Sequence, residues 1–187
     1  MTVKASVFIA TSLDGYISRL DGSIDWLNEA NAAVPPGEDC GYAQFMSTVD
    51  IIVMGRHTFE QVLTFDPWPF DGKRLVVLSS RPLAIPSQLA SSVSASSESP
   101  AALIGRLSSE GGRTHLYIDG GKTIQGFLQA GLVDDITVTT IPVLLGAGRP
   151  LFGVLPRDMK LSLVSSKAYP FGFVQSTYRV GSATETA

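Results

Sequence analysis

Three short polar clusters in this sequence each follow an apolar, strand-like run and carry residue types that bind phosphate. In chain order these clusters are Gly55-Arg56-His57-Thr58, Ser79-Ser80-Arg81 and Gly120-Gly121-Lys122-Thr123. Arginine presents a planar fork that pairs with two phosphate oxygens, and glycine lets a backbone approach a ligand closely. The clusters therefore point to a phosphate-bearing ligand held at three strand ends.

The first two clusters also have plain structural interpretations. Gly55 lets the chain turn out of its strand, and we expect Thr58 to cap the following helix, which leaves Arg56 either at an anion or in solvent. Ser79-Ser80-Arg81 suits a 2′-phosphate on an adenosine ribose, or it is a polar turn closed by Pro82.

The third cluster is not a P-loop. That motif requires a glycine five residues before the one that precedes lysine, and position 116 is a leucine. The spacing of G-x-G-x-x-G is absent as well. Gly120 and Gly121 are thus either a close-approach turn for a dinucleotide or a tight strand–helix turn. Three such ends in one short chain favour a ligand over coincidence.

The elements that must position these clusters alternate along the chain. We expect strands at 3–10, 51–54, 75–78, near 93, 115–118 and 136–142, and helices at 42–47, 58–65, 101–110 and 123–130. This alternation predicts one α/β domain over residues 1–187, with a central, mostly parallel sheet of about eight strands and helices on both faces. Residues 160–168 and 173–180 predict a closing antiparallel hairpin, whereas 11–41 are expected to form a long loop and 146–150 a turn.

Composition excludes several classes of protein. A net charge of −3 leaves no basic stripe for nucleic acid, and one cysteine excludes an internal disulfide and a cysteine-rich zinc site. The two histidines lie far apart in sequence and do not suggest a metal. We expect neither a signal peptide nor a membrane span, and therefore a cytoplasmic protein.

The motifs in their order resemble the dihydrofolate reductase superfamily. "VMGRHTFE" is similar to that family's cofactor-helix segment, "VVLSSRP" to its ribose-phosphate strand and "YIDGGKTIQGFL" to its glycine turn. "SLDGYIS" and "LVDDITVTTIPVLLGAGRPLF" most resemble the stand-alone relatives of the riboflavin-biosynthesis reductase domain. The resemblance covers nearly the whole chain and implies a three-layer dihydrofolate-reductase-like fold. No deaminase partner is indicated, because His-x-Glu and Cys-x-x-Cys are absent from the sequence.

This resemblance implies an NADPH-dependent reductase that transfers a hydride to a C=N or C=O carbon of a pterin- or aminopyrimidine-like substrate. Arg56, His57 and Thr58 would hold the phosphates of the cofactor, and Ser79, Ser80 and Arg81 its ribose phosphate. The turn of Gly120, Gly121, Lys122 and Thr123 would line the diphosphate and nicotinamide side. Related reductase domains also imply a homodimer. True dihydrofolate reductase activity and a non-catalytic nucleotide- or pterin-binding protein remain alternatives.

The acid for this reaction is the least determined residue. In dihydrofolate reductases a carboxylate lies sixteen residues before the glycine of the cofactor helix, which selects Asp39 here. Asp39 is either the catalytic acid or a cap for the helix at Tyr42. Tyr42 and Phe45, one helical turn apart, either stack on a substrate ring or belong to the core. Lys73 replaces the arginine that binds the folate tail, and lysine pairs less well with a carboxylate.

Overall fold

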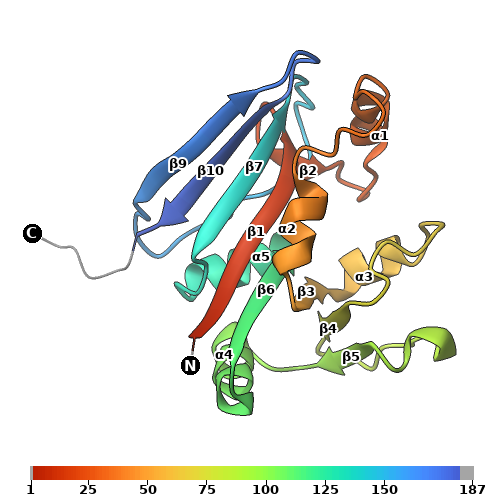
Figure 1. The fold of residues 1–187 in the computed structure, drawn as a ribbon, viewed down its shortest axis with the longest axis vertical. Coiled ribbons are helices and arrows are strands. Elements are labelled where there is room, and N and C mark those ends of the chain that lie inside the picture. The colour runs from red at the N-terminus through yellow and green to blue at the C-terminus, as the bar shows by residue number, and fades with distance from the viewer. Residues whose placement is uncertain (1, 182–187) are drawn as a thin grey trace, which may run out of the picture.

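One eight-stranded sheet runs through the molecule in the order β5-β4-β3-β6-β1-β7-β10-β9 (Figure 1). The structure is a computed structural model, and it describes residues 2–181. The strands of this sheet are β1 (Thr2–Ser12), β3 (Ile51–Gly55), β4 (Arg74–Leu78), β5 (Val93–Ser96), β6 (Arg113–Asp119), β7 (Asp135–Ile141), β9 (Leu161–Ala168) and β10 (Val174–Val180). From β5 to β7 neighbouring strands pair in parallel, and β10 pairs antiparallel with both β7 and β9. The predicted fold class is confirmed.

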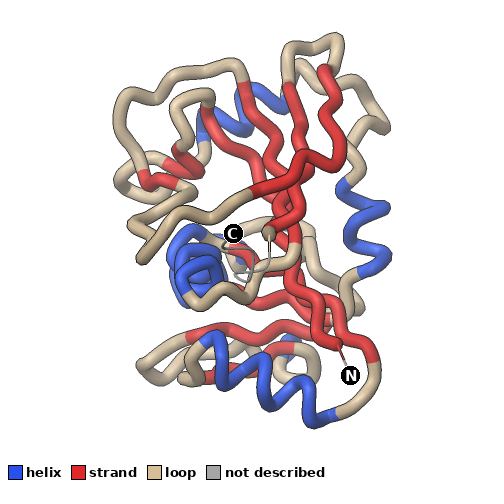
Figure 2. Tube along the Cα trace, turned by 90° about the vertical axis from the view of Figure 1, so that its left-hand side faces the viewer, coloured by secondary structure: helices blue, strands red, loops and turns tan. Residues whose placement is uncertain are grey.

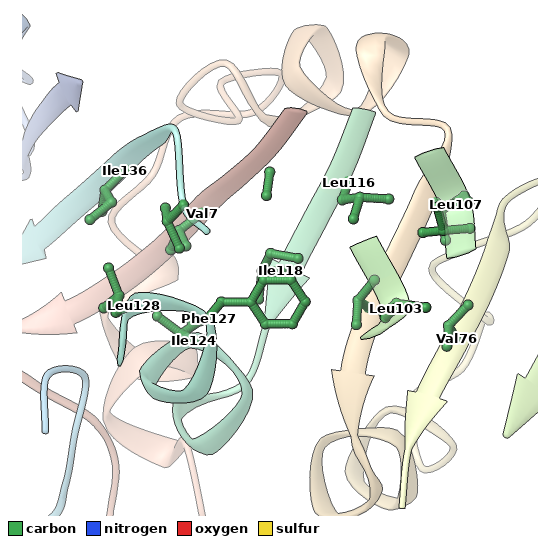
Figure 3. Packing of buried hydrophobic residues seen from close by; sticks show 14 of the residues in the cluster. Val7, Val76, Leu103, Leu107, Leu116, Ile118, Ile124, Phe127, Leu128 and Ile136 are labelled. Atoms are coloured by element: carbon green, nitrogen blue, oxygen red, sulfur yellow. The ribbon is translucent and has the colours of Figure 1, made fainter. Parts of the chain in front are cut away.

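Helices cover both faces of the sheet (Figure 2). They are α1 (Asp25–Asn31), α2 (Tyr42–Thr48), α3 (Arg56–Val62), α4 (Pro100–Glu110) and α5 (Gly121–Gln129), together with a short 3-10 turn at Ser87–Leu89. On one face α4 and α5 pack on side chains such as Val7 and Ile118, and Figure 3 shows Phe127 of α5 beside Ile118. On the other face α2 and α3 pack on Ile52 and Met54.

The central strands are buried because their sequences are apolar without interruption. Ile51–Met54 is fully buried, since one face meets α4 and α5 and the other meets α2 and α3. Parallel pairing of β4, β3, β6 and β1 places their carboxyl ends at one edge of the sheet. This arrangement brings residues 55, 78 and 119, far apart in sequence, to the same side of the molecule.

Three local predictions are corrected by the structure. Residues 11–41 contain a short strand, β2 (Tyr16–Ser18), and α1, and the predicted turn at 146–150 contains β8 (Arg149–Pro150), which pairs with β2. Partners far away in the sequence stabilise β2 and α1. β2 pairs with β8, and α1 buries Trp26 beside Tyr169 and Phe173. Thr58 does not cap α3, because the helix already begins at Arg56, directly after Gly55.

In the described part of the chain, no helix has both the length and the apolar character that spanning a membrane requires.

Candidate functional site

A cleft of about 1360 Å³ opens along the edge where the parallel strands end. All three polar clusters found in the sequence line it. They contribute Gly55, Arg56, His57, Thr58, Ser79, Ser80, Arg81, Gly120, Gly121, Lys122 and Thr123. The structure thus brings every sequence-predicted cofactor residue into one continuous site.

Glycines allow the first turns of α3 and α5 to meet at the floor of the cleft. A Cβ atom at Gly120 would overlap the side chain of Thr58, and Gly120 has φ +85°, a conformation that other residues rarely adopt. A Cβ atom at Gly55 would lie 3.1 Å from Oγ1 of Thr123. These glycines therefore let the starts of α3 and α5 pack closely together, and the positive, N-terminal end of the nine-residue helix α5 lines the cleft.

Arg56 organises the serine loop rather than facing solvent. Its guanidinium donates to Oγ of Ser79 over 2.9 Å and to the carbonyl oxygen of Arg81 over 2.8 Å, and it also donates to the carbonyl of Pro82. Oγ of Ser79 in turn donates to the carbonyl of Arg81 over 2.7 Å. Arg56 therefore holds the loop after β4 in a fixed shape and leaves Ser80 and Arg81 exposed at the cleft.

Two further basic residues, His57 and Lys122, line the cleft. His57 is exposed, and its Nδ1 lies 3.4 Å from a carboxylate oxygen of Glu60. Lys122 is exposed at the first turn of α5. Lys122 and Arg81 give the polar part of the cleft a positive character that suits a phosphate-rich ligand.

The other part of the cleft is apolar. It lies between the end of β1, the segment around β2 and α1, and the second turn of α3. The apolar residues that line it are Ile9, Ala10, Ile17, Ile24, Leu27, Val62 and Phe65. This half of the cleft is suited to a flat, uncharged ring placed next to the phosphate-binding half.

Asp119, at the end of β6, contributes a carboxylate to the lining of the cleft. Its side chain is partly buried, and the backbone N–H of Gly120 donates to it over 2.8 Å. Burial raises the pKa of Asp119 to about 6, although the Gly120 N–H and the Tyr117 hydroxyl act in the opposite direction. A carboxyl group with such a pKa is protonated in a minor fraction of molecules at neutral pH, and that fraction can donate its proton.

Sequence reasoning missed Asp119. The signal was present in "YIDGG", where a carboxylate ends an apolar strand immediately before two glycines. In parallel sheets that position faces the ligand edge. The shift in its pKa depends on packing by neighbours such as Tyr117, which the sequence does not locate.

Asp39 lies outside the cleft and performs the alternative role considered for it. Its carboxylate accepts hydrogen bonds from the backbone N–H groups of Gly41 and Ala43, each over 2.8 Å, at the start of α2. These hydrogen bonds, that of Ala43 first, hold the pKa of the exposed Asp39 below its usual range. The geometry favours a helix-capping carboxylate, which is ionised at neutral pH.

Tyr42 and Phe45 pack under α2 and do not line the cleft. Phe45 stacks on Phe8 with ring centroids 4.9 Å apart and meets Tyr117 edge-on at 5.2 Å. Tyr42 lies 5.7 Å from the Phe8 ring, and burial, followed by the charge of Asp119, raises its pKa to about 12. The structure therefore favours a core role for both aromatic side chains, with Tyr42 beside the Asp119 carboxylate.

The sheet order, the paired helix starts and the ligand cleft define a dihydrofolate-reductase-like α/β fold. The chain belongs to the RibD C-terminal domain family, whose model matches residues 4–174.

Individual relatives agree with this family. The uncharacterized protein YwjB of Bacillus subtilis (strain 168) is 36% identical over 171 residues, covering 90% of this chain and 94% of that protein. The crystal structure of a "putative riboflavin biosynthesis protein" from Shewanella sp. PV-4 has a TM-score of 0.87 and 38% identity, covering 95% of this chain and 99% of that one.

The bifunctional diaminohydroxyphosphoribosylaminopyrimidine deaminase/5-amino-6-(5-phosphoribosylamino)uracil reductase of Thermotoga maritima is more distant. It has a TM-score of 0.70 and 14% identity, covering 95% of this chain and 56% of that one. At this identity the likeness shows the fold alone.

Proposed function

We propose that this protein is an NADPH-dependent reductase that transfers a hydride to a C=N or C=O carbon of a small pterin- or aminopyrimidine-like heterocycle. The observation that carries the proposal is the single cleft that joins a cationic, glycine-floored half to an apolar half. A dinucleotide fits the first half and a flat ring the second, with their reactive atoms meeting near Asp119.

The residues of the polar half fit the cofactor. Ser80 and Arg81, held in place by Arg56, would bind the 2′-phosphate of the adenosine ribose, because an arginine fork pairs with two phosphate oxygens. The start of α5 at Gly120 and Gly121, which lines the cleft, would lie beside the diphosphate and the nicotinamide side. When bound, NADPH supplies the hydride.

We assign the proton to Asp119 rather than to Asp39. Asp119 lines the cleft and has a pKa of about 6, so that about a tenth of the molecules carry the proton at pH 7, far more than for an ordinary aspartate. Asp39 is exposed, ionised and occupied at the start of α2. The Asp119 carboxyl would protonate the heteroatom next to the carbon that accepts the hydride, and the apolar wall would keep water from the reacting atoms.

The chemistry of the apolar half and the name of one structural neighbour support this substrate class. A protein from Corynebacterium diphtheriae with 17% identity and a TM-score of 0.63 is described as pyrimidine reductase-like. True dihydrofolate reductase activity is less well supported. Nζ of Lys73 donates to the carbonyls of Met46 and Val49, each over 2.8 Å, and so caps the end of α2. Its donors are therefore already used by the protein and are not directed at a folate carboxylate.

The decisive experiment is a fluorescence titration with NADPH, followed by NADPH-oxidation assays over pterins, aminopyrimidines and quinonoid compounds. We expect binding and turnover of at least one heterocycle. Tight NADPH binding without turnover on the whole panel would favour a non-catalytic binding protein instead, and absence of NADPH binding would reject the proposal.

We also propose a homodimer formed through the β9 edge. All eight residues of β9 are exposed although the strand is regular, and Leu161, Leu163 and Val164 are 42–60% exposed. An apolar edge strand invites pairing, and the same edge on a second copy would be its complement about a twofold axis.

A further inference from the structure

A small two-stranded strap crosses the cleft and ties together the two helices that form its floor. The strap consists of residues 16–23, which include β2, and residues 148–151, which include β8. On the α5 side, Nε2 of Gln125 donates to the carbonyls of Pro150 over 3.0 Å and Leu151 over 3.3 Å. On the α3 side, Nε2 of Gln61 donates to the carbonyl of Gly22 over 3.3 Å. Two glutamine amides therefore hold the strap across the site.

The strap lies closely over the first turn of α5. A Cβ atom at Gly121 would be 2.8 Å from Cδ1 of Ile17 and 3.6 Å from the carbonyl oxygen of Pro150. A Cβ atom at Gly148 would be 2.5 Å from the carbonyl oxygen of Ser18. Glycine at position 121 lets the strap approach the helix, and glycine at position 148 lets the two strands of the strap approach each other. The backbone of Pro150, the residue after Arg149, therefore lies next to the start of α5.

Arg149 is positioned by its surroundings but retains free donors. Its Nε donates to the carbonyl of Leu20 over 3.1 Å. Its guanidinium lies flat against Gly22, where a Cβ atom would be 3.3–3.5 Å from Nη1, Cζ and Nη2. Among residues 2–181, neither Nη atom makes a hydrogen bond and no carboxylate lies within 4.0 Å of the group. Arg149 lines the cleft, so its free edge is available to an anion there.

The position of Arg149 selects one anion of the proposed cofactor. The 2′-phosphate would lie at Arg81, after β4, and β4 is two strands away from β6, a separation of about 10 Å. The strap contacts the chain after β6, at Gly121, instead. In a dinucleotide whose adenosine end is at β4, the anionic group that reaches this position is the diphosphate.

We infer that Arg149 binds the diphosphate of the cofactor on the side opposite to Gly120 and Gly121, so that the diphosphate lies between the strap and the start of α5. This inference rests on the proposed function and adds a binding residue from a segment outside the three polar clusters. Arg149 contacts the dinucleotide and takes no part in the transfer of the hydride or proton.

The test compares two ligands on matched variants of the full chain. NADPH carries both the 2′-phosphate and the diphosphate, whereas adenosine 2′-monophosphate carries the former alone. Arg149→Gln should weaken NADPH binding by about tenfold or more, the usual effect of a charge-assisted contact, and leave adenosine 2′-monophosphate unchanged. Arg81→Gln should weaken both ligands. Arg149→Lys should lie between wild type and Arg149→Gln, because it keeps the charge without the fork.

Arg113→Gln is the matched control, since Arg113 is an exposed arginine at the opposite end of β6. It should bind both ligands as the wild type does. Unchanged NADPH affinity in Arg149→Gln would overturn the inference, and so would an equal loss for both ligands in that variant. If the wild type binds neither ligand, the proposed function itself is rejected. That outcome is distinguishable from a failure of the inference about Arg149, in which the wild type binds both ligands.

Discussion

The guanidinium of Arg56, the first residue of α3, donates to Oγ of Ser79, which lies directly after β4, over 2.9 Å. This hydrogen bond joins two of the three polar clusters and decides the shape of the loop that carries Arg81. Its importance can be tested without knowledge of the substrate.

Arg56→Ala should lower NADPH affinity although Arg56 is largely occupied by protein partners. The loop from Ser79 to Pro82 loses several hydrogen bonds in this variant, and a buried or partly buried bond of this kind is worth roughly 1–3 kcal/mol. NADPH titration measures the effect, and Ser79→Ala should reproduce part of it. Wild-type affinity in both variants would contradict an organising role.

Arg81 should determine the choice between NADPH and NADH. One bidentate contact with a 2′-phosphate is worth roughly 1.5–3 kcal/mol, so we expect at least a tenfold preference for NADPH. Arg81→Ala should remove this preference while NADH affinity stays the same. Parallel titrations with the two cofactors give the ratio of their affinities directly. A ratio near one in the wild type would contradict binding of the 2′-phosphate by Arg81.

Asp119→Asn should reduce turnover by about 10²–10⁴ and leave NADPH binding nearly intact, because the variant loses the proton source alone. In the wild type, the rate should be constant below the Asp119 pKa of about 6 and decline as pH rises above it. Asp39→Asn is the matched control and should keep both turnover and its pH profile. The reverse result, with loss of turnover in Asp39→Asn only, would identify Asp39 as the catalytic acid.

The same two carboxylates should affect stability with opposite signs. The folded pKa of Asp119 is raised, so the folded state holds the proton more tightly and loses stability as pH rises from about 4 to about 6. Asp119→Asn should therefore gain about 1–3 kcal/mol over wild type between pH 4 and pH 7. Asp39, whose pKa is lowered, stabilises the fold above its unfolded pKa and loses this contribution as pH falls. Urea unfolding at several pH values measures both differences.

Light scattering at tens of micromolar should give the mass of a dimer. Leu163→Lys should shift the measured mass toward that of the monomer, because each β9 strand would then carry an additional positive charge at the interface between the two copies. Leu144→Lys provides the control, since Leu144 is exposed but is not part of β9. A monomeric wild type, or an equal shift in both variants, would reject pairing at this edge.

The sequence by itself determined the layers of the fold and the polar half of the site. Uninterrupted apolar runs such as Ile51–Met54 can only be buried on both faces, and their alternation with helices requires a parallel sheet. Parallel strands end at one edge, so Arg56, Ser79 and Gly120 had to lie near one another. These conclusions depend on local patterns and on a rule of topology, both of which are readable along the chain.

Only the tertiary structure located the carboxylate that we propose as the acid, the packing of the aromatic pair and the strap. The pKa of Asp119 depends on burial among Tyr117, Tyr42 and their neighbours, and the carboxylate of Asp39 is occupied by local N–H groups that a spacing rule ignores. Arg149 reaches Leu20 and Gly22 across more than a hundred residues of chain. Burial and long-range pairing depend on which residues pack against a side chain in the folded protein. These residues are distant in sequence, so a local sequence pattern does not identify them.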